Sequence, residues 1–178
     1  MPQITNEFVK KYLEENNLTV LDFNDTKPWG GYYVYEIGKN YDKKLLWVKP
    51  GQYLSLQYHG TKEHPGHKEE WKALTNIKVV LGNENIAENP EKIDEDLEGL
   101  RIIEVLKNDT IEIPSGFMHA LVNPYNTDIF LLETRTSLLE ESSESREKNI
   151  TRVYDQTQRD GIPKWPDYLV GQINELAI

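Results

Sequence analysis

The stretch that decides the fold is KPGQYLSLQYHGTKEHPGHKEEW, from Lys49 to Trp71. It contains three of the four histidines of the chain, His59, His64 and His67. Gln57 and His59 are two residues apart in a run that is typical of a β-strand, so their side chains are expected on one face. This spacing predicts that an amide and an imidazole point into the same cavity.

The fourth histidine, His119, follows a Pro-x-Gly turn in the segment IPSGFMHALVNP, residues 113–124. Imidazoles, a carboxylate and an amide oxygen can together hold a divalent metal ion. We therefore predict that this segment and the first one close around one metal ion. For His64 and His67, in a Pro-Gly loop, the alternatives are a solvated loop and a mobile loop over the pocket.

Composition sets the class of protein. The chain has 178 residues, which favours one domain over residues 1–178, and its 10% aromatic side chains favour a β-rich fold. The core of this domain is expected at about residues 20–137, with a C-terminal extension over 138–178. It has no cysteine, which excludes disulfides and thiolate chemistry, and its net charge of −10 argues against nucleic-acid binding. Without a signal-like segment or a long apolar run, we expect a cytoplasmic protein that does not bind membranes.

Turn residues divide the chain into many short apolar or alternating runs. Strands are expected at 18–23, 32–37, 45–48, 53–59, 69–80, 100–106, 110–113, 119–122 and 129–135. Helices are expected at 4–17, 91–97 and 168–176. The polar segment 41–44 is interpreted as a loop, 81–83 as a turn and the acidic segment 87–99 as an insertion. This pattern predicts a small barrel or sandwich.

The order of KPWGGY, VKPGQYLSLQYH, EEW and IPSGFMHALVNP resembles the cupin module of type II phosphomannose isomerases. The resemblance covers about residues 27–135 and continues more weakly through NITRVYDQTQRDG, residues 149–161. It implies an all-β cupin fold, a double-stranded β-helix or jelly-roll barrel. The predicted terminal helices would add a short N-terminal helix and a C-terminal helical tail.

The resemblance also implies a set of metal ligands. These ligands are Gln57, His59, Glu69 and His119. Strand alternation agrees for the acid, because Glu69 shares a face with Trp71 whereas Glu70 shares one with Lys72. The cofactor implied is one divalent ion, zinc first, with Mn, Fe, Co or Ni as alternatives.

The activity implied is a metal-dependent aldose–ketose isomerase, converting mannose 6-phosphate to fructose 6-phosphate through an enediolate that the cation stabilises. A base must move the proton between C1 and C2, and the unranked candidates are Glu70, His67 and Lys68. Three cations are either surface charges or a phosphate clamp. They are Lys27, Arg135 and Arg152.

Departures from the family pattern keep other functions open. The spacer between His59 and Glu69 is long, and the family's arginine before the acid falls on His67. The alternatives are an isomerase of free aldoses such as lyxose and a non-catalytic sugar-binding cupin, whereas the glutamine ligand points away from a dioxygenase. The partner expected is a small sugar or sugar phosphate. A homodimer is expected only by analogy with other cupins.

Overall fold

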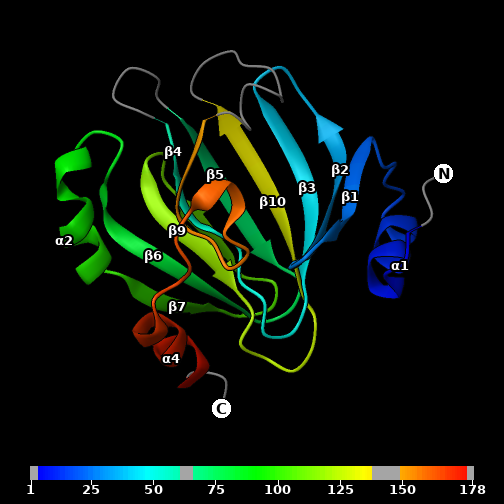
Figure 1. Ribbon diagram of the computed structural model, residues 1–178. Coiled ribbons are helices and arrows are strands. Elements are labelled where there is room, and N and C mark those ends of the chain that lie inside the picture. Colours follow the sequence, from blue (N-terminus) through cyan, green and yellow to red (C-terminus); the bar gives the residue numbers. More distant parts are fainter. Residues whose placement is uncertain (1–3, 61–65, 138–148, 176–178) are drawn as a thin grey trace.

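The computed structural model describes residues 4–60, 66–137 and 149–175, in which two antiparallel β-sheets face each other (Figure 1). In spatial order, the first sheet consists of β1 (Asp22–Lys27), β2 (Gly30–Ile37), β3 (Tyr41–Val48), β10 (Ile129–Ser137), β5 (His67–Ala73) and β8 (Thr110–Ile113). The second consists of β11 (Ile150–Tyr154), β4 (Leu56–His59), β9 (Phe117–Val122), β6 (Ile77–Asn85) and β7 (Arg101–Val105). The predicted all-β class is confirmed.

The described residues also form short helices. They are α1 (Glu7–Glu15), η1 (Pro90–Lys92), α2 (Ile93–Glu98), η2 (Arg159–Gly161) and α4 (Asp167–Glu175). Figure 1 shows α1 outside the first sheet, and α2 and α4 on the side of the second. Among the described residues, no helix is long and apolar enough to cross a membrane.

The terminal helices form where the sequence predicts them. The Asn6 side chain accepts hydrogen bonds from the backbone N–H groups of Phe8 and Val9, which caps the start of α1. Val9 and Leu13, four residues apart, pack on the outer face of the first sheet. In α4, Leu169 and Ile173 have the same spacing and pack on the outer face of the second sheet. The central strands contain runs of consecutive apolar residues because both faces of each sheet are covered.

The space between the sheets has an apolar part and a polar part. Along β10, Ile129 and Leu131 lie in the inner hydrophobic cluster, and two and four residues later the same inward face carries Glu133 and Arg135. The neighbouring strands β3 and β5 change from polar to apolar at the matching level, because β10 pairs with both in antiparallel register. The barrel therefore has a packed apolar end and an end lined with charged groups.

Four local predictions were wrong, and one strand was missed. The single strand predicted over 69–80 is two strands, β5 and β6, which lie in different sheets. The strand predicted at 18–23 begins only at Asp22, as β1. Segment 41–44 belongs to β3 rather than to a loop, and its inward residues pair with β10. Segment 81–83 lies inside β6, where the Asp96 carboxylate accepts hydrogen bonds from the N–H groups of Asn83 and Glu84 in place of a turn. β11, which was not predicted, pairs with β4, so the second sheet takes a strand from beyond residue 137.

Candidate metal centre

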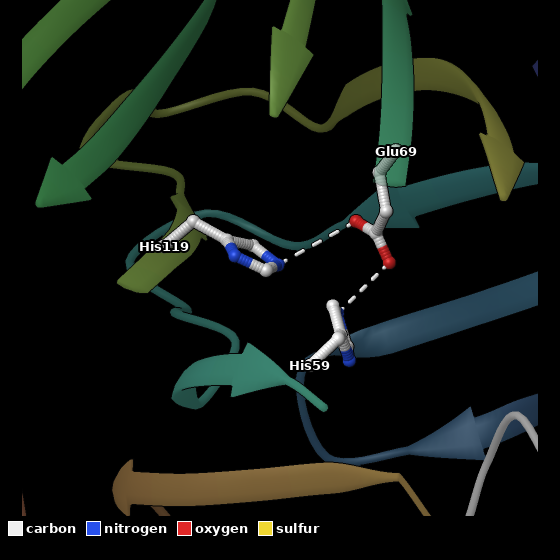
Figure 2. Close-up of side chains that lie close together, drawn as sticks. All are labelled: His59, Glu69 and His119. Atoms are coloured by element: carbon white, nitrogen blue, oxygen red, sulfur yellow. Dashed lines mark ion pairs between the residues drawn. The ribbon is translucent and has the colours of Figure 1, made fainter. Parts of the chain in front are cut away.

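Three residues from three different strands come together inside the polar end of the barrel. His59 ends β4, Glu69 lies in β5 and His119 in β9, and all three side chains are buried. Their ligand atoms lie within 4.8 Å of one another, and Figure 2 shows the imidazoles directed at the carboxylate. These three residues were predicted as metal ligands from the sequence, and together they could hold a metal ion.

Backbone geometry explains why these strands approach so closely. Gly116 has φ +79°, a left-handed conformation that favours glycine and closes the turn before β9. Gly66, just before β5, packs so tightly against the backbone of His59 that a Cβ atom would overlap it. The two glycines thus bring the chain segments that carry Glu69 and His119 next to β4.

The Glu69 carboxylate is the centre of the group. Its Oε1 lies 3.0 Å from His59 Nε2 and 3.2 Å from His67 Nε2. Its Oε2 accepts a hydrogen bond of 2.8 Å from Trp71 Nε1 and lies 3.5 Å from His119 Nε2. Because every one of these side chains is buried, the carboxylate is fixed in one orientation.

The His119 ring is oriented to present a lone pair. Its Nδ1 lies 2.9 Å from the carbonyl oxygen of Phe117, which can only accept, so Nδ1 carries a proton. In the neutral ring, Nε2 then directs its lone pair at Glu69, and this atom makes no hydrogen bond within the described residues. A cation between Nε2 and the carboxylate would remove this repulsion, so the residues fit a metal ion.

The protonation states of His59 and Glu69 agree with this fit. Burial lowers the pKa of His59 to about 3, against the opposing effect of Glu69, so the ring is neutral near pH 7. Burial alone would raise the pKa of Glu69, but the electrostatic effect of His59 and the close contacts with the neighbouring histidines hold it well below its ordinary value. Burial lowers the pKa of His119, but the contact with Glu69 outweighs burial, so the net shift is upward. Such a shift is expected where a proton occupies the position of a cation. Neutral imidazoles and an ionised carboxylate are the metal-binding forms.

The group opens onto a cavity of about 130 Å³. The cavity is lined by Lys27, Trp29, Tyr32, Lys44, Leu46, Leu54, Ser55, Gln57, His59, Glu69, Glu133, Arg135, Ile150, Arg152 and Arg159. Gln57 pairs across the strands with His119, and its Oε1 accepts a hydrogen bond of 2.7 Å from Ser55 Oγ. Gln57 therefore lies on the cavity wall beside the histidines, and its role as fourth ligand stays a prediction.

The three cations of the predicted clamp all line this cavity, although they come from separate segments. Lys27 and Arg152 are half-buried. Arg135 is buried, and its guanidinium donates two hydrogen bonds, of 3.0 and 2.9 Å, to the Asp42 carboxylate. Because Asp42 holds Arg135 in this geometry, it suits a structural ion pair better than a phosphate clamp. Arg159, which the sequence did not nominate, lines the cavity and is held by Asp155.

The candidate bases fall in two places. Lys68 and Glu70 are exposed on the outer face of β5, where Lys68 pairs with Glu112, so neither side chain lines the cavity. Strand alternation puts both side chains on the other face of β5 from Glu69, so neither is placed to act as the base. His67 is buried, and its ring stacks on that of His59 with centroids 3.9 Å apart, so the solvated interpretation was wrong. His64 lies outside the described residues.

Besides Arg159, two charged residues of the cavity were missed. Lys44 and Glu133 are buried, and Lys44 Nζ lies 3.5 Å from Glu133 Oε1. A signal for Glu133 was present, because it shares a predicted strand face with the apolar residue Leu131 and so points inward. No such signal existed for Lys44, since a run of polar residues indicates a loop as readily as a strand.

Two antiparallel sheets closed around an inner histidine–carboxylate group define the chain as a cupin. Among solved structures, CapF from Staphylococcus aureus, a capsular polysaccharide assembling protein, matches with a TM-score of 0.56 and 15% identity, over 85% of this chain and 40% of that chain. A mutant of the oxalate decarboxylase OxdC from Bacillus subtilis matches with a TM-score of 0.51 and 13% identity, over 88% of this chain and 34% of that chain. At such identities the likeness shows the fold alone.

The particular family follows from the sequence. The chain belongs to the family described as Mannose-6-phosphate isomerase C-terminal, whose model matches residues 14–153. Mannose-1-phosphate guanylyltransferase ManC of Salmonella typhimurium is 33% identical over 117 residues, which are 65% of this chain and 20% of that protein. Mannose-1-phosphate guanylyltransferase of Escherichia coli K12 is 34% identical over 116 residues, again 65% and 20%. The chain thus spans about a fifth of the length of these relatives.

The register of β5 leads to a test of the acidic ligand. We expect Glu69→Gln to weaken metal binding by at least about 100-fold, because it removes the central charge of the group. Glu70→Gln is the matched control, since it makes the same change one residue away on the outer face, and metal affinity should stay unchanged. Competition with a chromophoric chelator measures both affinities. The reverse ranking would show that the strand is shifted by one residue.

Proposed function

We propose that the chain is a metal-dependent aldose–ketose isomerase acting on a sugar phosphate, with mannose 6-phosphate to fructose 6-phosphate as the first reaction to test. The observation that carries this proposal is a shared cavity. One wall holds the candidate metal ligands His59 and Glu69, and other walls hold basic side chains from separate segments. The family description and the names of the relatives, both of which refer to mannose phosphates, support the sugar class.

The basic residues suit an anionic substrate. The protein has a net charge of −10, so a phosphorylated sugar is repelled at long range and needs cations close by. Lys27, Arg152 and Arg159 supply such charge at the cavity, and an arginine fork matches the geometry of phosphate oxygens. Trp29 and Leu46 provide apolar surface beside them, as is usual where a sugar ring is bound.

The candidate ligands suit a divalent ion with nitrogen and oxygen donors, zinc first and then Mn, Fe, Co or Ni. Such an ion, when bound, supplies Lewis-acid stabilisation of negative charge on the sugar oxygens. His59 and His119 would hold it with neutral ring nitrogens, and Glu69 would neutralise part of its charge. Gln57 would orient a sugar hydroxyl or complete the ligand shell from the adjacent wall.

A substrate screen tests the proposal. Metal-loaded protein is incubated with mannose 6-phosphate, other aldose phosphates and free aldoses including lyxose, and the products are identified by NMR. Isomerisation of a phosphosugar supports the proposal. Turnover of free aldoses alone would replace it with the lyxose-type alternative, and binding without turnover would indicate a sugar-binding cupin.

The cations provide a second test. Lys27→Ala or Arg152→Ala should each raise KM for the phosphosugar by roughly tenfold for every ~1.4 kcal/mol lost, because each change removes a charge at the cavity. Metal content should not change, and the effect should shrink at high salt because partly exposed charges are screened. Lys72→Ala, which removes a cation from the exposed face of β5, is the matched control. Unchanged KM in both cavity variants would argue against the clamp.

A further inference from the structure

We propose that Glu133 is the catalytic base that moves the proton between C1 and C2 of the sugar. The inference rests on the proposed isomerase function. It assigns a residue to the proton transfer, which neither the metal ligands nor the cations of the cavity perform. It comes from the position of Glu133 in the barrel, from its neighbours and from the absence of a competing carboxylate among the described residues of the cavity wall.

Register places Glu133 beside the candidate metal centre. In the pairing of β10 with β5, Arg135 lies opposite Glu69, and Glu133 lies opposite Trp71. Glu133 is therefore the diagonal neighbour of Glu69 on the inward face, at a spacing of about 7–8 Å between Cα atoms. A sugar whose oxygens meet a metal ion at Glu69 would have its first carbons between the two carboxyl groups.

The neighbours of Glu133 leave its carboxylate available to the cavity. Lys44 Nζ lies 3.5 Å and Arg135 Nε 3.7 Å from Glu133 Oε1, while the closer hydrogen bonds of Arg135 go to Asp42. Burial raises the pKa of Glu133 to about 7, helped by Glu69 and Asp42 and opposed by Lys44 and Arg135. A carboxyl group that titrates near the working pH is suited both to take up and to return a proton.

Other candidates are excluded by position. Among the described residues that line the cavity, the carboxylates are Glu69 and Glu133. Glu69 is engaged by His59, His67 and Trp71, which suits a ligand rather than a base. Glu133 is the carboxylate that remains.

The step balances without a further reactant. The Glu133 carboxylate takes the proton from C2 of the open-chain aldose, the electrons of that C–H bond form the C1–C2 double bond, and the carbonyl pair moves onto O1. Return of the proton to C1, with passage of the hydroxyl proton from O2 to O1, gives the ketose. The Lys44 ammonium, held 3.5 Å from Glu133, acts as a positioning residue that keeps the carboxylate in place.

The experiment compares the unsubstituted protein with Glu133→Gln, using mannose 6-phosphate in D₂O. NMR follows both isomerisation and deuterium incorporation into the sugar. Glu133→Gln should lower kcat and the rate of exchange by about 100- to 10,000-fold, the usual contribution of a general base. KM should change by less than about threefold and metal content should stay the same, because the cations and ligands are intact.

The matched control is Glu112→Gln. It neutralises a glutamate that also pairs with a lysine, Lys68 at 3.1 Å, but on the exposed face, and it should behave as wild type. Glu133→Asp is the second variant. It keeps the charge but withdraws the carboxylate by one methylene, so kcat should fall by up to about 100-fold in a protein that keeps its charge balance.

The outcomes separate the two proposals. Full exchange in Glu133→Gln would overturn the inference and leave the isomerase function standing; if that variant does not fold, a fall of less than about tenfold in Glu133→Asp would do the same, because moving a reacting group by about 1 Å costs up to about 100-fold. A wild type that neither isomerises a phosphosugar nor exchanges its C2 proton would overturn both. Loss of exchange in Glu133→Gln together with normal metal content and a normal KM is the expected result.

Discussion

Replacing His59 or His119 with alanine should reduce bound divalent metal from about one ion per chain to a small fraction of that value. Each imidazole supplies one of the three buried ligand groups, and its removal leaves Glu69 with an incomplete shell. Metal analysis of protein dialysed against buffer without chelator, combined with competition titration, measures the loss. We expect the double variant to retain essentially none.

His67 gives this experiment a matched control within the same cluster. It is a buried histidine that contacts Glu69 Oε1 at 3.2 Å, but it does not belong to the group of mutually close ligand atoms. His67→Ala should therefore weaken metal affinity by about 10- to 100-fold, the usual effect of losing a residue that orients a ligand. Equal losses for His59, His67 and His119 would make His67 a ligand. One ion per chain in the double variant would show that these residues do not form the metal site.

Replacing Asp42 with alanine should lower the free energy of unfolding by about 3–5 kcal/mol, because the buried Arg135 guanidinium loses its bidentate carboxylate. Both side chains are almost fully buried, so water cannot replace the missing charge. Urea unfolding monitored by tryptophan fluorescence measures the change.

Lys43→Gln is the control for this prediction. Lys43 is the next residue of β3 but points outward, where it pairs with Glu36 at 2.8 Å in a partly exposed position. Its loss should cost no more than about 1 kcal/mol. Similar values for the two variants would mean that the buried pair stabilises the barrel no more than an exposed one.

The metal site shows which features are readable from local spacing. Gln57 and His59 share a face because strand side chains alternate, and the same rule separates Glu69 from Glu70. His119 was found because a Pro-x-Gly turn directs the start of the following strand. These are properties of a few consecutive residues, and the tertiary structure preserves them.

Roles that depend on a neighbouring strand were not readable. Arg135 looked like a substrate cation until Asp42, 93 residues away in the sequence, was found beside it. Lys44 and Asp42 looked like loop residues because the charged groups that pair with them lie in β10 and not in their own segment. The side chains of Lys68 and His67 are adjacent in sequence, yet one is exposed and the other buried.

The sequence by itself determined the all-β class and which side chains share a strand face at the site, because alternation and turn chemistry act over neighbouring residues. Together with the family resemblance, it also identified the three clustered candidate ligands. Only the tertiary structure decided which charges neutralise one another and which face the cavity. Those outcomes depend on the pairing of β10 with β3 and β5, which brings Asp42, Arg135, Glu69 and Glu133 into one buried layer. In such a layer the cost of desolvation makes every charge depend on partners that are distant in the sequence.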